Sequence, residues 1–212
     1  MNKATKLNVA VFGSIFGISG INHGFFEILQ GNKLTPGLFV MAIGEAQKMW
    51  LHGNEPALTI IPNFMISGVL SVFIGGLIIL WSIKFVHLKY GPIILFILFT
   101  ILLLVGGGIA QIIFFPWICL VASRINKTPI ISIMKLPLNI QQLFSNIWPF
   151  LLSISGFILV FALFVATTGF IPGISNPEII MFIMLCSLVI DLVLIALTYF
   201  SGFVRDAILK KV

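Results

Sequence analysis

The chain has 212 residues, of which 59% are apolar and only 8% are charged, and its mean hydropathy is +1.18. Because soluble domains carry about 25% charged residues, this composition excludes a single water-soluble core and indicates helices that are solvated by lipid. Twelve Lys and Arg against six Asp and Glu give a net charge of +6, and the basic residues form short clusters between apolar runs. That distribution suits the positive-inside rule and attraction to anionic headgroups. It argues against nucleic-acid binding, which requires a continuous basic face.

The first apolar run, residues 7–29, is long enough to cross a hydrocarbon core about 30 Å thick. Its glycines recur at helical spacing and share one face: Gly13, Gly17, Gly20 and Gly24. In a bilayer such a stripe of small residues favours the close approach of another helix. His23 and Glu27 lie one helical turn apart beside the stripe, so we expect both side chains to point into the bundle.

The connection that follows, residues 31–63, contains a second amphipathic stretch. Residues 35–50 are apolar enough to touch the membrane, but they include Glu45 and Lys48 and are too short to cross it comfortably. Pro36 indicates a helix start, which predicts an interfacial or re-entrant helix with Trp50 at the level of the headgroups. A loop rich in Gly and Pro follows, with His52 and Glu55 three residues apart.

Residues 64–85 form a second span, but the next apolar run, residues 91–125, is ambiguous. As one helix it would be about 50 Å long, and as two helices each leg would have about 17 residues, the short limit for a span. One crossing with the N-terminus outside leaves eight Lys and Arg inside against four outside. Two crossings with both termini inside leave ten inside against Lys33 and Lys48. The positive-inside rule therefore favours two crossings, and Gly106–Gly108 is a natural place for the chain to reverse.

The sequence after residue 125 predicts a loop with a surface-lying helix over residues 126–146, followed by spans over residues 147–170 and 177–204. The fold class is therefore all-α, a polytopic transmembrane helix bundle of six spans, with five as the alternative. Residues 1–212 form a single integral membrane domain with an interfacial or re-entrant segment between spans one and two. We expect a multi-pass protein of the cell membrane with both termini in the cytoplasm.

Asp191 is the residue of the last predicted span that costs most free energy to place in a membrane, since it lies near the middle of SLVIDLVLIAL. A carboxylate at that depth costs at least a few kcal/mol and normally faces inward, has a partner or is protonated. Two interpretations stay open: a site for a proton, a cation or a ligand, and an interhelical hydrogen bond made by a neutral Asp.

Four residues near the outer end of span one form the other candidate site: His23, Glu27, His52 and Glu55. Two imidazoles and two carboxylates suffice to ligate zinc, iron or manganese. Their spacing is nevertheless generic and does not match the HExxH motif. Metal binding, binding of a solute or proton, and structural hydrogen bonding therefore all stay open, and no metal or cofactor can be named.

Other chemistries lack the residues they require. A bis-His haem needs two intramembrane histidines, and His23 alone is placed to be one. The sequence contains no Walker motif and no GxSxG, and we interpret Cys119 and Cys186 as apolar packing residues.

The leading hypothesis is transport or binding of a small solute or ion in a polar cavity built by His23, Glu27 and Asp191, with the His52–Glu55 loop as its lid. The alternatives are a membrane-embedded, metal-dependent enzyme acting on a lipophilic substrate and a non-catalytic accessory subunit that uses the glycine stripe as a partner surface. The expected partners are the lipid bilayer, a small solute or ion, and either a second copy of the chain or another membrane subunit.

Overall fold

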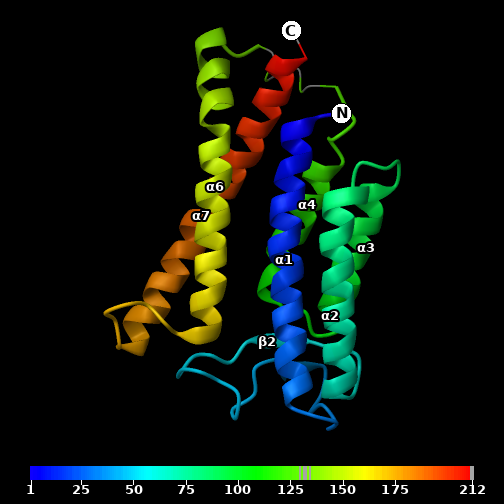
Figure 1. Ribbon diagram of the computed structural model, residues 1–212, viewed down its shortest axis with the longest axis vertical. Helices are drawn as coiled ribbons and strands as arrows, with labels where there is room; N and C mark the ends of the chain where they lie inside the picture. The colour runs from blue at the N-terminus through cyan, green and yellow to red at the C-terminus, as the bar shows by residue number, and fades with distance from the viewer. Residues whose placement is uncertain (129, 131–132, 134, 211–212) are drawn as a thin grey trace.

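The structure is a computed structural model that describes residues 1–128, 130, 133 and 135–210. Most of the described chain is helical, and the helices run between two ends of the molecule (Figure 1). The elements, in chain order, are α1 (Lys3–Leu29), β1 (Phe39–Met41), β2 (Pro56–Leu58), α2 (Phe64–Leu80), a π-helical turn η1 (Trp81–Phe85), α3 (Gly91–Leu104), a 3₁₀ turn η2 (Ala110–Ile113), α4 (Phe114–Ala122), α6 (Leu138–Thr168) and α7 (Pro177–Leu209).

Four helical segments are long and apolar enough to cross a membrane: Lys3–Leu29, Phe64–Phe85, Leu138–Thr168 and Pro177–Leu209. The prediction of an all-helical fold with several helices able to cross a membrane is therefore confirmed. The two legs of the ambiguous run, Gly91–Leu104 and Gln111–Ala122, are shorter. The chain does reverse between them, because Val105 pairs with Thr59 near β2 while Ile125 accepts a hydrogen bond from the Asn2 amide at the other end.

The glycine stripe of α1 packs against α2 within the same chain. A Cβ on Gly24 would lie 2.5 Å from the Gly68 carbonyl oxygen, and a Cβ on Gly17 would lie 2.8 Å from that of Gly75. Ser71 Oγ donates a hydrogen bond of 3.1 Å to the Gly20 carbonyl at the same contact. The expected close helix approach is thus present. Since α2, η1 and α3 together cover the stripe, it is not free to serve as the surface of an accessory subunit.

The connection between α1 and α2 differs from its prediction. Residues 35–50 contain no helix; instead β1 and β2 form a two-stranded antiparallel sheet, with Val40 opposite Ala57. Val40 and Ala57 are buried while their neighbours in the strands are more exposed, which is the two-residue alternation of a half-buried strand. The interfacial or re-entrant helix was therefore wrong, because apolar content alone does not set the period of the backbone.

Helix α6 begins at Leu138, so the described residues 138–146 belong to this helix and not to the predicted loop. Pro149 lies inside α6 and has no N–H for the carbonyl of Ser145, the residue four positions earlier. Arg205 of α7 donates a hydrogen bond of 2.8 Å to that carbonyl. The helix can continue through the proline because a side chain from its neighbour satisfies the freed acceptor.

Both termini lie at one end of the bundle (Figure 1), where side chains cap helix ends far away in the sequence. Asp206 accepts hydrogen bonds from the amides of Ala4 and Thr5, at 3.0 and 2.8 Å, and from Thr5 Oγ1 at 2.7 Å. It thereby supplies the N-terminal cap that α1 lacks locally. Asn2 Nδ2 donates to the carbonyl of Arg124 at 2.7 Å, just beyond the end of α4.

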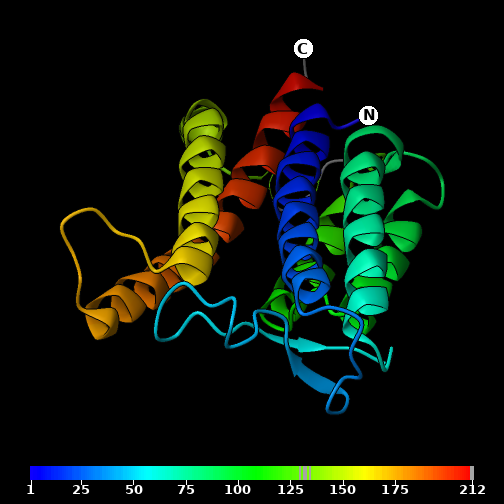
Figure 2. The ribbon, with the colours of Figure 1, turned by 60° about the horizontal axis from the view of Figure 1, so that its bottom comes forward.

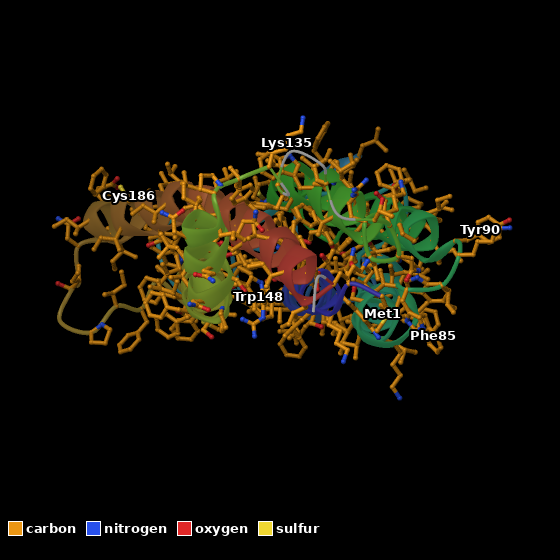
Figure 3. The ribbon with its side chains drawn as sticks, turned by 90° about the horizontal axis from the view of Figure 1, so that it is seen from above. Met1, Phe85, Tyr90, Lys135, Trp148 and Cys186 are labelled. Atoms are coloured by element: carbon orange, nitrogen blue, oxygen red, sulfur yellow. The ribbon has the colours of Figure 1, made fainter. Side chains whose placement is uncertain are left out.

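The bundle consists of two halves. One holds α1 to α4 and the other holds α6 and α7, and Tyr90 and Cys186 mark their opposite edges when seen from above (Figure 3). The halves meet near the termini, while the far end of α7 diverges from α1 and the connection 31–63 covers that end (Figures 1 and 2). We call this the loop end. The main hydrophobic core includes residues of both halves, and in the first half the rings of Phe99 and Phe115 stack with centroids 4.2 Å apart.

Candidate functional site

A cavity of about 480 Å³ lies between α1 and α6 at the loop end. Most of its lining is apolar, with Phe25 and Phe26 from α1 and Val160 and Phe164 from α6. Met49 of the connection also contributes to it. The cavity arises where the two halves separate, and its size lies within the range of small-molecule sites, about 300–1,000 Å³. It is open to the outside of the bundle, since the lining residues Phe25, Val160 and Phe164 are about half exposed.

The polar part of this cavity is centred on His23 and Glu55. His23 Nε2 of α1 lies 3.5 Å from Glu55 Oε2, which comes from the residue just before β2. The amide of Ala42 donates a hydrogen bond of 2.8 Å to the Glu55 carbonyl, so the small sheet fixes the backbone of this acid. The His23 side chain is 6% exposed and that of Glu55 is 20% exposed. The cavity thus contains a buried imidazole beside a carboxylate that solvent still reaches.

Glu27 lies one turn further along α1 and is fully buried, but it does not line the cavity. A Cβ on Gly106 would overlap the Glu27 carboxyl group, and a Cβ on Gly108 would lie 2.8 Å from His23 Cε1. Gly106 and Gly108 also have φ values of +99° and +94°, which favour glycine. The glycines between α3 and α4 therefore do more than reverse the chain: they make room for both polar side chains of α1.

Further hydrogen bonds join α1 to its neighbours along the cavity. Asn22 Nδ2 donates to Thr167 Oγ1 of α6 at 3.1 Å, and Gln111 Nε2 donates to Ser19 Oγ at 2.7 Å. Gln111 thus makes an interhelical hydrogen bond. Sequence reasoning did not select Asn22, Ser19 or Thr167 for the site. Asn22 could have been noticed as the polar neighbour of His23, whereas isolated Ser and Thr are common in membrane helices and give no such signal.

His52 does not join the cavity. Its Nε2 lies 2.8 Å from Glu178 Oε1, in the first turn of α7. The nearby Trp50 Nε1 donates a hydrogen bond of 2.9 Å to the carbonyl of Ala166 near the end of α6. These two contacts hold the connection 31–63 against the second half of the bundle. The segment thereby covers the loop end, and His52 lies at its edge in contact with α7.

Asp191 lies in α7 and is fully buried. Ser155 Oγ of α6 donates a hydrogen bond of 2.8 Å to Asp191 Oδ1. Asp191 is not among the residues that line the α1–α6 cavity. The structure therefore brings His23 and Glu55 together in the cavity. Glu27 lies one turn away against Gly106, and Asp191 lies at the contact between α6 and α7.

Glu45, an acid of the connection 31–63, makes its polar contacts within that connection and not with a helix. Glu45 accepts a hydrogen bond of 2.6 Å from Asn54 Nδ2 and forms an ion pair with Lys48. The hydrogen bonds from Lys48 and then Asn54 lower the pKa of this exposed carboxyl below its ordinary value. These contacts organise the part of the connection 31–63 that precedes Glu55.

The described residues contain no group of three or more His, Cys, Asp or Glu placed to hold a metal ion. Cys119 is buried, Cys186 is half-buried and both are free thiols. His23 and Glu55 alone would supply only two ligands, fewer than the three or four protein ligands of typical zinc sites.

The fold and the cavity define a class: a helical protein with helices long enough to cross a membrane and an amphipathic cavity between two of them. Comparison with models of known families, with curated proteins and with solved structures found no match.

Proposed function

We propose that this chain is a multi-pass membrane protein that binds a small amphipathic molecule in the α1–α6 cavity. The observation that carries the proposal is the cavity itself, which has apolar walls of Phe25, Val160 and Phe164 and a polar site at His23 and Glu55. An apolar body would lie against the walls while a polar group replaces or joins the contact between His23 and Glu55. The sequence predicts a small solute or ion as the ligand. We propose an amphipathic molecule instead, because the cavity is mainly apolar.

The proposed orientation places the termini in the cytoplasm. Basic residues gather at the termini end, and the loop end carries only Lys33 and Lys48 among the described residues. The described basic residues of the termini end are Lys3, Lys6, Lys84, Lys89, Arg124, Lys127, Lys135, Arg205 and Lys210. By the positive-inside rule the cavity then opens near the outer face.

Six crossings of the cell membrane are part of the same proposal. The α3 leg runs from Gly91, whose carbonyl accepts a hydrogen bond from Trp81 Nε1, to Val105 beside Thr59. The α4 leg returns to Ile125 beside Asn2. Each leg thus joins the two ends of the bundle, although the 14 residues of α3 cover only about 21 Å as a helix.

The binding proposal can be tested by the thermal stability of the purified protein in detergent with dodecylamine, dodecanol or dodecanoate. Val160→Trp would fill the cavity, and Val189→Trp is the matched control, since Val189 is an exposed residue of α7 outside it. We expect at least one of the three amphiphiles to raise the melting temperature of the wild type and of Val189→Trp but not of Val160→Trp. Equal responses of both variants to every amphiphile would contradict a site in this cavity.

Transport is a second step of the proposal. It requires the connection 31–63 to move, and this segment is held to α6 and α7 through the contacts of Trp50 and His52. Flux of a bound amphiphile into proteoliposomes tests this step. Faster flux in His52→Ala than in the wild type would support a lid, and flux no greater than in empty liposomes would leave binding alone as the function.

A further inference from the structure

We propose that the α1–α6 cavity selects a lipophilic cation, that is, an ammonium or phosphonium group attached to an apolar body. This inference rests on the proposed binding function and adds the charge of the ligand. The molecule would lie among the apolar side chains with its cationic centre near Glu55.

The charges around the cavity favour a cation. Among the described residues, His23 and Glu55 are the ionisable side chains that line it, and no described Lys or Arg does so. Glu27 is buried one turn away on the same helix. With Glu55 ionised, the summed charge of these three side chains is zero or negative in every protonation state of the other two. In the negative states a cation is attracted and an anion is repelled, and in the neutral state the summed charge favours neither ion.

The C-terminal ends of two helices make the electrostatic potential in the cavity more negative. The last turns of α1 and α6 reach the loop end, and Phe26, Thr167 and Thr168 from these turns line the cavity. The C-terminal end of a helix carries a partial negative charge of roughly half a unit. Of the N-terminal helix ends at this side, those of α2 and α7 are capped by the side chains of Asn63 and Asn176. The N-terminal end of η2 has no side-chain cap, but it follows directly on the C-terminal end of α3, whose partial charge is of opposite sign.

Aromatic rings supply the third contribution. Phe25, Phe26 and Phe164 line the cavity, and the face of an aromatic ring attracts a cation electrostatically. The basic residues of the connection do not cancel the effect, because Lys48 is paired with Glu45 and Lys33 is exposed outside the lining.

Tetraphenylphosphonium and tetraphenylborate test the inference, because the two ions have nearly the same size and apolar surface but opposite charge. Equilibrium dialysis of the purified protein in a neutral detergent measures the binding of each ion. The part of this binding that is lost in Val160→Trp is the binding inside the cavity. We expect the binding inside the cavity to be at least about tenfold tighter for the cation. Glu55→Gln should reduce the preference at least fivefold, whereas Glu55→Asp and the control Asp191→Asn, which removes an acid outside the cavity lining, should retain it.

The outcomes separate the two proposals. If both ions bind equally in the cavity, or the borate binds more tightly, the cavity binds amphipathic molecules but the charge selection is wrong. The inference also fails if Glu55→Gln keeps the preference or if Asp191→Asn loses as much of it. If neither ion shows a component sensitive to Val160→Trp and the dodecyl amphiphiles show none either, the proposed function itself fails.

Discussion

The carboxyl group of Glu27, on α1, lies directly against the backbone of Gly106, which follows α3. There is no room for a Cβ at Gly106, and its φ of +99° belongs to the left-handed region that favours glycine. The Gly106 amide also donates a hydrogen bond of 2.9 Å to the Leu58 carbonyl of β2. One glycine thus links a buried acid, the end of α3 and the strand next to Glu55.

Gly106→Ala should destabilise the protein by about 2–4 kcal/mol, because it combines an unfavourable backbone conformation with overpacking against Glu27. Gly173→Ala separates the two causes, since Gly173 has a φ of +80° but nothing within 4 Å of an added Cβ. Denaturant unfolding in detergent should show a loss of about 1 kcal/mol in that control. An equal loss in both variants would mean that the contact with Glu27 contributes nothing.

Asp206→Asn should weaken the start of α1. The carboxylate accepts two backbone amides and a hydroxyl, and hydrogen bonds to a charged group are worth about 1.5–3 kcal/mol. Asp191→Asn is the control, because Asp191 accepts a single hydrogen bond from Ser155. Hydrogen exchange should be faster over the first two turns of α1 in Asp206→Asn only. Unchanged exchange there would show that Asp206 is not the cap of this helix.

Arg205 and Pro149 should be energetically coupled. Arg205→Gln removes the donor to the Ser145 carbonyl and the contact of the guanidinium with the Trp148 ring, so we expect a loss of about 1–3 kcal/mol. In a Pro149→Ala background the new amide can donate to Ser145, and the loss should fall by about 1 kcal/mol. A double-mutant cycle of unfolding free energies measures this difference. Strict additivity would contradict the role assigned to Arg205.

The connection 31–63 should loosen in acid through Glu45. The pKa of this carboxyl is lowered in the folded state by the hydrogen bonds from Lys48 and Asn54. A lowered folded pKa gives a contribution that is fully present above the ordinary value of 4.5 and is lost as the pH falls through the folded value. Limited proteolysis of residues 44–54 should therefore become faster below about pH 4. Glu45→Gln should be cleaved at one rate across this range; a rate that still rises in the variant would assign the effect to another group.

The architecture could be predicted largely from hydropathy and glycine spacing, because both act within one helix or between close neighbours. The stripe around Gly17 predicted a close helix contact, and Gly106–Gly108 predicted a reversal. The partners of the polar residues could not be predicted in the same way. His23 and Glu27 share a helix face, yet His23 contacts Glu55 because a strand far along the chain presents that acid.

Asp191 is a second polar residue whose partner could not be predicted from the sequence. Its place in an apolar run indicates its depth in the bundle, but the run does not indicate which neighbouring helix it faces. The structure pairs it with Ser155 in α6 and so removes it from the cavity of α1. The small sheet around Val40 was missed because a three-residue alternation is too short to outweigh the apolar content of its surroundings.

Photolabelling with a diazirine-bearing analogue of dodecylamine, followed by peptide mass spectrometry, tests the location of the site most directly. We predict adducts on Met49 and Phe164, which line the cavity, and their loss when unlabelled dodecylamine is added. Phe182 and Val193, which are exposed on α7 outside the cavity, provide the background of contact with the surrounding detergent or lipid. Equal labelling of both sets, unaffected by competition, would contradict a binding site between α1 and α6.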